Sequence, residues 1–254
     1  MESEVRPKQS PKSKEVDSSK MFLSQFQIEK LEYYFNFFDA DGNGKLELRD
    51  LEFIKKRILD FTGWTENSQQ ALKSAEVHEA FFEVLFKRVE GDSAEPKQEV
   101  TLTEWMNMWE KLLPCTMGMQ NFPVWMRLLP ETLFRMIDRN GDNEIDEDEL
   151  AHFYEKMCDV EPDEAKTQAK KAIDQMTDNG NYPLDATSYE QIFANFLIGR
   201  TPFGPGRFIF ACFSHKDPQF QLIAPVVEEA KPASRARRGS KGVEIPRIKR
   251  QALQ

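Results

Sequence analysis

Two stretches of twelve residues, each rich in side chains that carry oxygen, constrain this chain of 254 residues most strongly. The first covers residues 39–50 and the second covers residues 138–149. In each, carboxylate or amide side chains stand at positions 1, 3 and 5, which is the spacing of a loop that wraps hard oxygen ligands around a divalent cation. Apolar residues at helical spacing flank both stretches. The pattern predicts a helix, a cation-binding loop and a second helix at each place.

The loop at residues 39–50 offers ligands at positions 1, 3, 5, 7, 9 and 12. Position 7 acts through its backbone carbonyl, and Gly44 at position 6 permits the sharp turn that the loop needs. Position 12 is Asp50, where glutamate is usual, so bidentate capture of Ca²⁺ is harder and a smaller cage that tolerates Mg²⁺ better is expected. The predicted ligands are Asp39, Asp41, Asn43, Lys45, Glu47 and Asp50.

The loop at residues 138–149 keeps the complete ligand set, because Glu149 at position 12 can bind an ion through both carboxylate oxygens. Position 6 is Asn143 instead of glycine. Asparagine tolerates a left-handed backbone better than most residues, so the turn is expected to form at the cost of some strain. The predicted ligands are Asp138, Asn140, Asp142, Glu144 through its carbonyl, Asp146 and Glu149.

Helix–loop–helix cation sites of this kind, called EF-hands, usually occur in pairs, and two degenerate loops supply the partners. In residues 93–104, Lys97 would point toward the ion and the turn glycine is missing. In residues 177–188, position 12 is Ser188, which cannot chelate through two oxygens. We therefore expect both loops to be structural. The expected contacts between paired loops are Leu46 with Val100 and Ile145 with Leu184.

Repetition of the helix–loop–helix pattern predicts an all-α fold of four EF-hands in two paired lobes, with short β bridges between loops. Ser24 and Gln27 form a capping signal for the first helix, and later helices are expected to begin near Thr103 and Pro130. The predicted divisions are a disordered tail over 1–20, hand pairs over 21–113 and 114–200, an apolar segment over 201–213 that packs on the lobes, and a disordered basic tail over 214–254.

Charge is distributed unevenly along the chain. The net charge is −9, although residues 214–254 carry nine basic and four acidic side chains, so the body is strongly acidic. Such a body attracts cations and repels phosphate backbones, which argues against nucleic-acid binding. The basic tail could contact a protein target or an anionic membrane surface, although a solubilising role is simpler. Arg237-Arg238-Gly239-Ser240 fits a basophilic kinase pattern, which makes Ser240 a candidate phosphorylation site.

Other features exclude several classes of protein. No apolar run approaches the roughly 20 residues that span a bilayer. The polar start of the chain and its three cysteines predict a cytoplasmic protein, and we expect a monomer. No enzyme is predicted, because the three histidines fit no catalytic or zinc pattern. The cysteines are Cys115, Cys158 and Cys212, and the histidines are His78, His152 and His215.

Several segments resemble the invertebrate sarcoplasmic calcium-binding proteins and, within that family, calexcitin. The likeness covers roughly residues 21–213. The resemblance implies a compact cytosolic protein with four hands that binds Ca²⁺ and Mg²⁺; calexcitin-like chains tend to have three working sites, so the degenerate second loop is a departure. The segments that carry the resemblance are Phe22-Leu-Ser-Gln-Phe-Gln, the insertion with Trp64, Val100-Thr-Leu-Thr-Glu-Trp-Met-Asn-Met-Trp109, Gly141-Asp-Asn-Glu-Ile-Asp and Gly206-Arg-Phe-Ile-Phe-Ala-Cys-Phe213.

Two functions stay open at this level, a Ca²⁺/Mg²⁺ buffer and a calexcitin-like calcium sensor that signals to a protein or membrane target. A sensor exposes a methionine-rich groove when Ca²⁺ binds, whereas a buffer barely opens. We favour core packing of the methionines, and we expect the apolar strip Phe208–Phe213 to fill the groove. Full exposure of Phe208 and Phe210 would contradict that expectation. The methionines concerned are Met106, Met108, Met117, Met119 and Met126.

Overall fold

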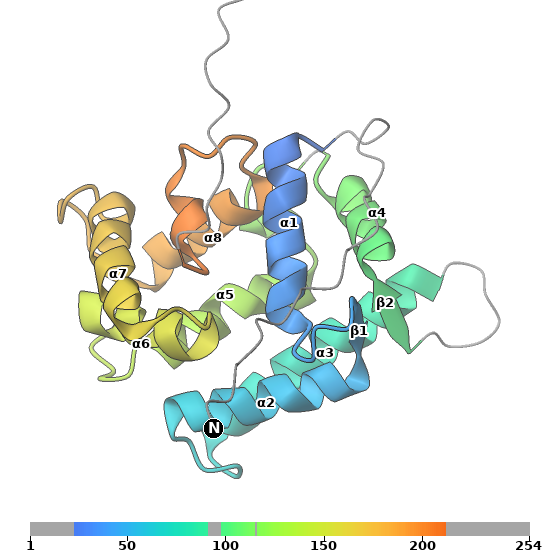
Figure 1. The fold of residues 1–254 in the computed structure, drawn as a ribbon, viewed down its shortest axis with the longest axis horizontal. Coiled ribbons are helices and arrows are strands. Elements are labelled where there is room, and N and C mark those ends of the chain that lie inside the picture. Colours follow the sequence, from blue (N-terminus) through green and yellow to red (C-terminus); the bar gives the residue numbers. More distant parts are fainter. Residues whose placement is uncertain (1–22, 91–97, 115, 212–254) are drawn as a thin grey trace, which may run out of the picture. The chain divides into compact units, whose positions relative to one another are not determined.

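The computed structural model describes residues 23–90, 98–114 and 116–211. Within these ranges the chain folds into helices joined by loops, with one small sheet (Figure 1). The predicted all-α class with four helix–loop–helix units is confirmed. The elements in chain order are α1 (Gln25–Phe38), β1 (Lys45–Glu47), α2 (Leu48–Thr62), α3 (Gln69–Glu90), β2 (Glu99–Thr101), α4 (Leu102–Leu112), η2 (Met119–Asn121), α5 (Val124–Ile137), α6 (Glu147–Met157), α7 (Pro162–Met176), α8 (Ala186–Ile198) and η3 (Pro205–Phe208).

Helix α1 begins with the capping box that the sequence predicts. The Gln27 amide N–H donates to Ser24 Oγ at 3.2 Å, and the Ser24 N–H donates to Gln27 Oε1 at 3.0 Å. Both bonds satisfy N–H groups that a helix start leaves without partners. The helix ends at Phe38, so that Asp39, its C-terminal cap, is also the first residue of the first candidate loop. Helix α1 therefore sets the direction in which that loop begins.

The cap of one helix and the start of another differ from the sequence prediction. Helix α4 is capped by Thr101 and not Thr103, because Thr101 Oγ1 accepts the Glu104 N–H while the Glu104 carboxylate accepts the Thr101 N–H at 2.9 Å. Helix α5 begins at Val124, which places Pro130 inside the helix instead of in its first turn. Proline removes one helical hydrogen bond, and burial of the surrounding apolar face offsets that loss. The buried neighbours are Trp125, Met126, Leu129 and Leu133.

The loops of consecutive hands meet as predicted. Strands β1 and β2 run antiparallel, and Leu46 lies opposite Val100, with both side chains fully buried. In the second pair, the Ile145 N–H donates to the Leu184 carbonyl at 3.0 Å. Both predicted contacts between loops are present, the first as a short β pairing and the second as one backbone hydrogen bond.

The two pairs of hands share one hydrophobic core. Helix α2 of the first pair packs on α6 of the second, where the Phe61 ring stacks on the His152 ring with centroids 5.2 Å apart. Helix α3 packs on α5, where the Phe81 and Trp125 rings lie 5.5 Å apart. The buried apolar residues form one cluster that extends from Leu23 to Ala211. Across the described residues, the buried core therefore continues from one pair of hands into the other.

The segment after α8 packs against this core. Phe208 and Phe210 are 4% and 1% exposed, so neither ring is open to solvent. The Phe210 ring lies 4.6 Å from the Phe37 ring, centroid to centroid. The hydroxyls of Tyr33 and Tyr154 donate to the backbone carbonyls of Phe210 and Phe208, respectively. The segment thus joins α1 to α6 through side chains and backbone together.

Gly206 lies directly against the backbone of α8. A Cβ added there would lie 2.2 Å from the backbone nitrogen of Phe196. Gly206→Ala is expected to lower the free energy of unfolding by about 2–4 kcal/mol, because helix backbone cannot move aside. Gly118→Ala is the control, since its Cβ would meet only the flexible Gln120 side chain. Urea unfolding measures both variants, and equal stability would contradict the tight approach.

Several predictions fall outside the described residues. These are the two tails over 1–20 and 214–254 with Ser240, residues 93–97 of the second loop, and Cys115 and Cys212. Across the described ranges, no helix has the length and apolarity needed to cross a bilayer.

Candidate metal centres

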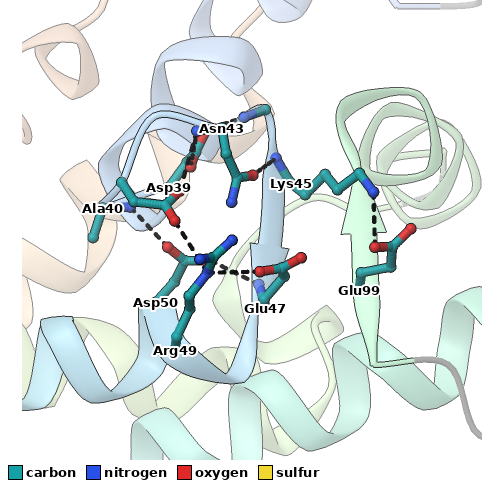
Figure 2. Close-up of polar contacts among 10 residues, drawn as sticks. Asp39, Ala40, Asn43, Lys45, Glu47, Arg49, Asp50 and Glu99 are labelled. Carbon is teal, nitrogen blue, oxygen red and sulfur yellow. Dashed lines mark hydrogen bonds and ion pairs between the residues drawn. The ribbon is translucent and has the colours of Figure 1, made fainter.

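The first candidate centre lies in the loop between α1 and β1 and at the start of α2 (Figure 2). Carboxylate oxygens of Asp39, Asp41 and Asp50 all lie within 4.8 Å of one another. Asp39 and Asp50 are buried, and burial raises the pKa of both carboxyls, with the other loop carboxylates raising it further. Three acidic groups this close repel one another, and a bound cation would relieve that repulsion. The donor set is the hard oxygen type that Ca²⁺ and Mg²⁺ prefer.

Backbone amides hold two of these carboxylates inside the loop. Asp39 accepts the N–H of Asn43 at 3.1 Å and the N–H of Gly44 at 2.8 Å, which ties position 1 to positions 5 and 6. Asp50 accepts the Ala40 N–H at 3.2 Å, which ties position 12 back to position 2. Gly44 has a φ of +81°, the left-handed conformation that glycine adopts readily. The predicted turn at position 6 is therefore present.

Arg49 covers the exposed side of this loop, and sequence reasoning missed it. Its Nε lies 3.0 Å from Asp41 and 2.8 Å from Glu47, which are the predicted ligands at positions 3 and 9. Figure 2 shows the contact with Glu47. The guanidinium therefore competes with a cation for both carboxylates. Lys45 points away from the loop and pairs with Glu99 at 2.8 Å, which leaves its backbone carbonyl as the predicted ligand. The sequence signal for the Arg49 contacts was a basic residue at position 11 of the loop.

The second candidate centre is the loop between α5 and α6. Asp138 accepts the N–H of Gly141 at 2.8 Å and that of Asn143 at 3.2 Å, and Asp142 accepts the Glu144 N–H at 2.9 Å. Asn143 has a φ of +67°, so position 6 adopts the left-handed turn expected of an asparagine. The side chains at positions 1 and 5 thus lie inside the turn of the loop.

Glu149 is held by the backbone of its own loop. Its carboxylate accepts the Arg139 N–H at 2.8 Å, the Asn140 N–H at 3.1 Å and the Asp146 N–H at 3.2 Å. Asp146 in turn accepts the Glu149 N–H at 2.8 Å and caps α6. In the part of the chain that is described, three carboxylates converge only in the first loop. The richer ligand set of the second loop is therefore present in sequence but less gathered in space.

Side chains of the two degenerate loops serve local structure. Glu104, at position 12 of the second loop, belongs to the capping box of α4. In the fourth loop, Thr177 Oγ1 accepts the Gly180 N–H at 2.9 Å, and Asp185 accepts the Ser188 N–H at 2.8 Å to cap α8. Serine at position 12 thus lies in the first turn of the helix and offers no carboxylate.

Known proteins share these motifs. The family model described as EF hand matches residues 31–55 and 131–154, which contain the two candidate centres. Sarcoplasmic calcium-binding proteins I, III and IV of Branchiostoma lanceolatum are 24% identical over 182 residues, covering 69% of this chain and 91% of the relative. Obelin of Obelia longissima is 22% identical over 167 residues, covering 65% of this chain and 81% of obelin.

Solved structures show the same fold. A sarcoplasmic calcium-binding protein from amphioxus superposes with a TM-score of 0.61 at 20% identity, covering 76% of this chain and all of that protein. Calcium-loaded apo-aequorin from Aequorea victoria gives a TM-score of 0.52 at 19% identity, covering 68% and 90% of the two chains. The chain thus carries two segments that match the EF-hand model and has the fold of the sarcoplasmic calcium-binding proteins.

Proposed function

We propose that this protein is a cytoplasmic calcium buffer that binds Ca²⁺ through residues 39–50 and 138–149, with Mg²⁺ competing for both loops. The observation that carries the proposal is the convergence of Asp39, Asp41 and Asp50, two of them buried, at ligand positions of a loop that matches the EF-hand model. The names of the amphioxus relatives support calcium as the ion.

Ion binding requires two rearrangements of polar contacts. In the first loop, a cation must replace the Arg49 guanidinium at Asp41 and Glu47. In the second, Glu149 must exchange some of its bonds to backbone N–H groups for the ion. The short side chain of Asp50 favours the tighter shell of Mg²⁺ in the first loop, while Glu149 favours the larger shell of Ca²⁺ in the second.

Burial of the methionines supports a buffer over a sensor. A sensor presents a methionine-rich groove to a target helix. Here the aromatic segment at Phe208 and Phe210 is itself buried against α1, α6 and α8, so a groove at that place is already filled. Met117, at 89% exposure, is the exception among the five methionines. The buried ones are Met106, Met108, Met119 and Met126.

Fluorescence of an apolar dye during a Ca²⁺ titration, in the presence of millimolar Mg²⁺, tests this proposal. A flat or falling signal is expected, because ion binding leaves the filled groove closed. Calcium uptake is measured in the same sample as the control. A large rise that follows calcium uptake would contradict the buffer and indicate a sensor with an exposed docking groove.

A further inference from the structure

Among the described residues, four buried side-chain atoms have no hydrogen-bond partner; one is Arg207 Nε, and the other three lie in the aromatic core. These three are the hydroxyl oxygens of Tyr34 and Tyr189 and the indole nitrogen of Trp109, and all three side chains are 0% exposed. The residues belong to α1, α8 and α4, which are helices of the first, fourth and second hands. A buried donor or acceptor without a partner has lost its hydrogen bonds to water and has formed none in the protein, which costs free energy. Native proteins therefore pair such groups with other protein groups or with buried water.

The three side chains lie in one region of the core. The rings of Tyr34 and Trp109 are 6.3 Å apart, centroid to centroid. The Phe193 ring lies 6.4 Å from the Tyr34 ring, and Phe193 stands four residues after Tyr189 on α8, so this part of α8 lies beside Tyr34. Burial raises the pKa of the Tyr34 phenol, and the Tyr189 phenol raises it further. Tyr34 on α1 therefore lies beside both α4, through Trp109, and the part of α8 that carries Tyr189.

Neighbouring polar groups in the same core do find partners. The Trp105 indole N–H donates to the Leu31 carbonyl at 2.9 Å, and its ring lies 5.6 Å from that of Tyr34. The hydroxyls of Tyr33 and Tyr154 donate to carbonyls of the C-terminal segment. Aromatic rings of α8 and of that segment form the remaining walls around Tyr34 and offer no acceptor from their side chains.

We propose that one or more water molecules occupy a polar site in the core between α1, α4 and α8, paired with Tyr34, Tyr189 and Trp109. Water suits these groups, because it accepts from an indole N–H and can both donate to and accept from a phenol. A buried water typically makes about three hydrogen bonds, and three protein groups are available. The site is independent of the ion loops, so it stands whether or not those loops bind Ca²⁺.

Phenylalanine substitutions and a crystal structure of the full chain test this site. Water density within hydrogen-bond distance of the Tyr34 and Tyr189 hydroxyls is expected. Tyr34→Phe and Tyr189→Phe should each lower the apparent Tm by about 2–4 °C, because each removes one hydrogen bond of the buried water and leaves the water and the other hydroxyl less well paired. The double variant should lose less than the sum, because the two groups share one partner.

Two further tyrosines provide matched controls. Tyr182→Phe, at an exposed position, should leave the Tm unchanged, and Tyr154→Phe should lower it through loss of a direct bond to Phe208. Electron density that shows no water beside the two tyrosine hydroxyls would overturn the proposal. So would single variants that are as stable as the parent protein, or a double variant whose loss of Tm equals the sum of the two single losses. Density for a larger organic molecule would also overturn it, because the occupant would not be water.

Discussion

Replacing Glu149 with glutamine is expected to weaken cation binding at residues 138–149 by on the order of 100-fold or more. Glu149 stands at position 12, which is the ligand expected to bind the ion through both of its carboxylate oxygens. Glutamine keeps the size of the side chain and one acceptor for the loop backbone, so the loop should still fold. Isothermal titration calorimetry with Ca²⁺ measures the loss, while binding at residues 39–50 should persist.

Glu147→Gln is the matched control for this variant. Glu147 is exposed in the first turn of the same helix. Its replacement by glutamine removes the same charge as Glu149→Gln but leaves every predicted ligand in place. Its Ca²⁺ affinity should stay within a few-fold of the parent protein, since an exposed charge acts through a screened field. Equal losses for both variants would show that net charge, and not the geometry of Glu149, governs binding.

Replacing Lys30 with methionine is expected to stabilise the protein at acidic and neutral pH. Lys30 is 0% exposed, and its Nζ donates to the Gly199 carbonyl at 2.7 Å at the end of α8. The rings of Phe26 and Phe196 lie 5.2 and 5.6 Å from the ammonium group. Burial lowers the pKa of Lys30 from 10.5 to about 7.

The sign of the pH dependence follows from this lowered pKa. Between about pH 7 and 10.5, the unfolded chain binds a proton on Lys30 that the folded chain has lost, so stability rises with pH. The charged form therefore penalises folding fully below about pH 7, by roughly 5 kcal/mol. Methionine removes that penalty but leaves the Gly199 carbonyl without its partner, which costs about 1–3 kcal/mol. The expected net gain at pH 6 is about 2–4 kcal/mol.

Chemical unfolding of parent and Lys30→Met proteins from pH 6 to 10 measures this effect. The gain should shrink as the pH rises and be lost near pH 10. Lys170→Met, at an exposed position on α7, is the control and should show no such trend. A difference between parent and Lys30→Met that is constant with pH would contradict a buried, charge-bearing lysine.

Local patterns predicted much of the structure. The loops at 39–50 and 138–149 and the capping box at Ser24 depend on residues a few positions apart, so their spacing in sequence is also their spacing in space. The pairing of Leu46 with Val100 was predictable because hands pair in chain order. These features need no knowledge of how distant helices pack.

Features that depend on distant contacts were not predicted. Lys30 is buried because the end of α8, 169 residues along the chain, supplies an acceptor and an aromatic wall. Pro130 lies inside a helix because burial of its neighbours outweighs a local preference. The Arg49 contacts depend on side-chain conformations that loop spacing leaves undetermined. Tertiary packing decided the cases of Lys30 and Pro130, whereas the Arg49 contacts lie within one loop.

The number of ions bound by the intact chain tests the central claim most directly. Native mass spectrometry of the full-length protein in excess Ca²⁺ should show two ions per chain, one in residues 39–50 and one in residues 138–149. Glu149→Gln should bind one ion under the same conditions. A chain that binds no ion, or one that binds three or four because the degenerate loops also bind, would contradict the account.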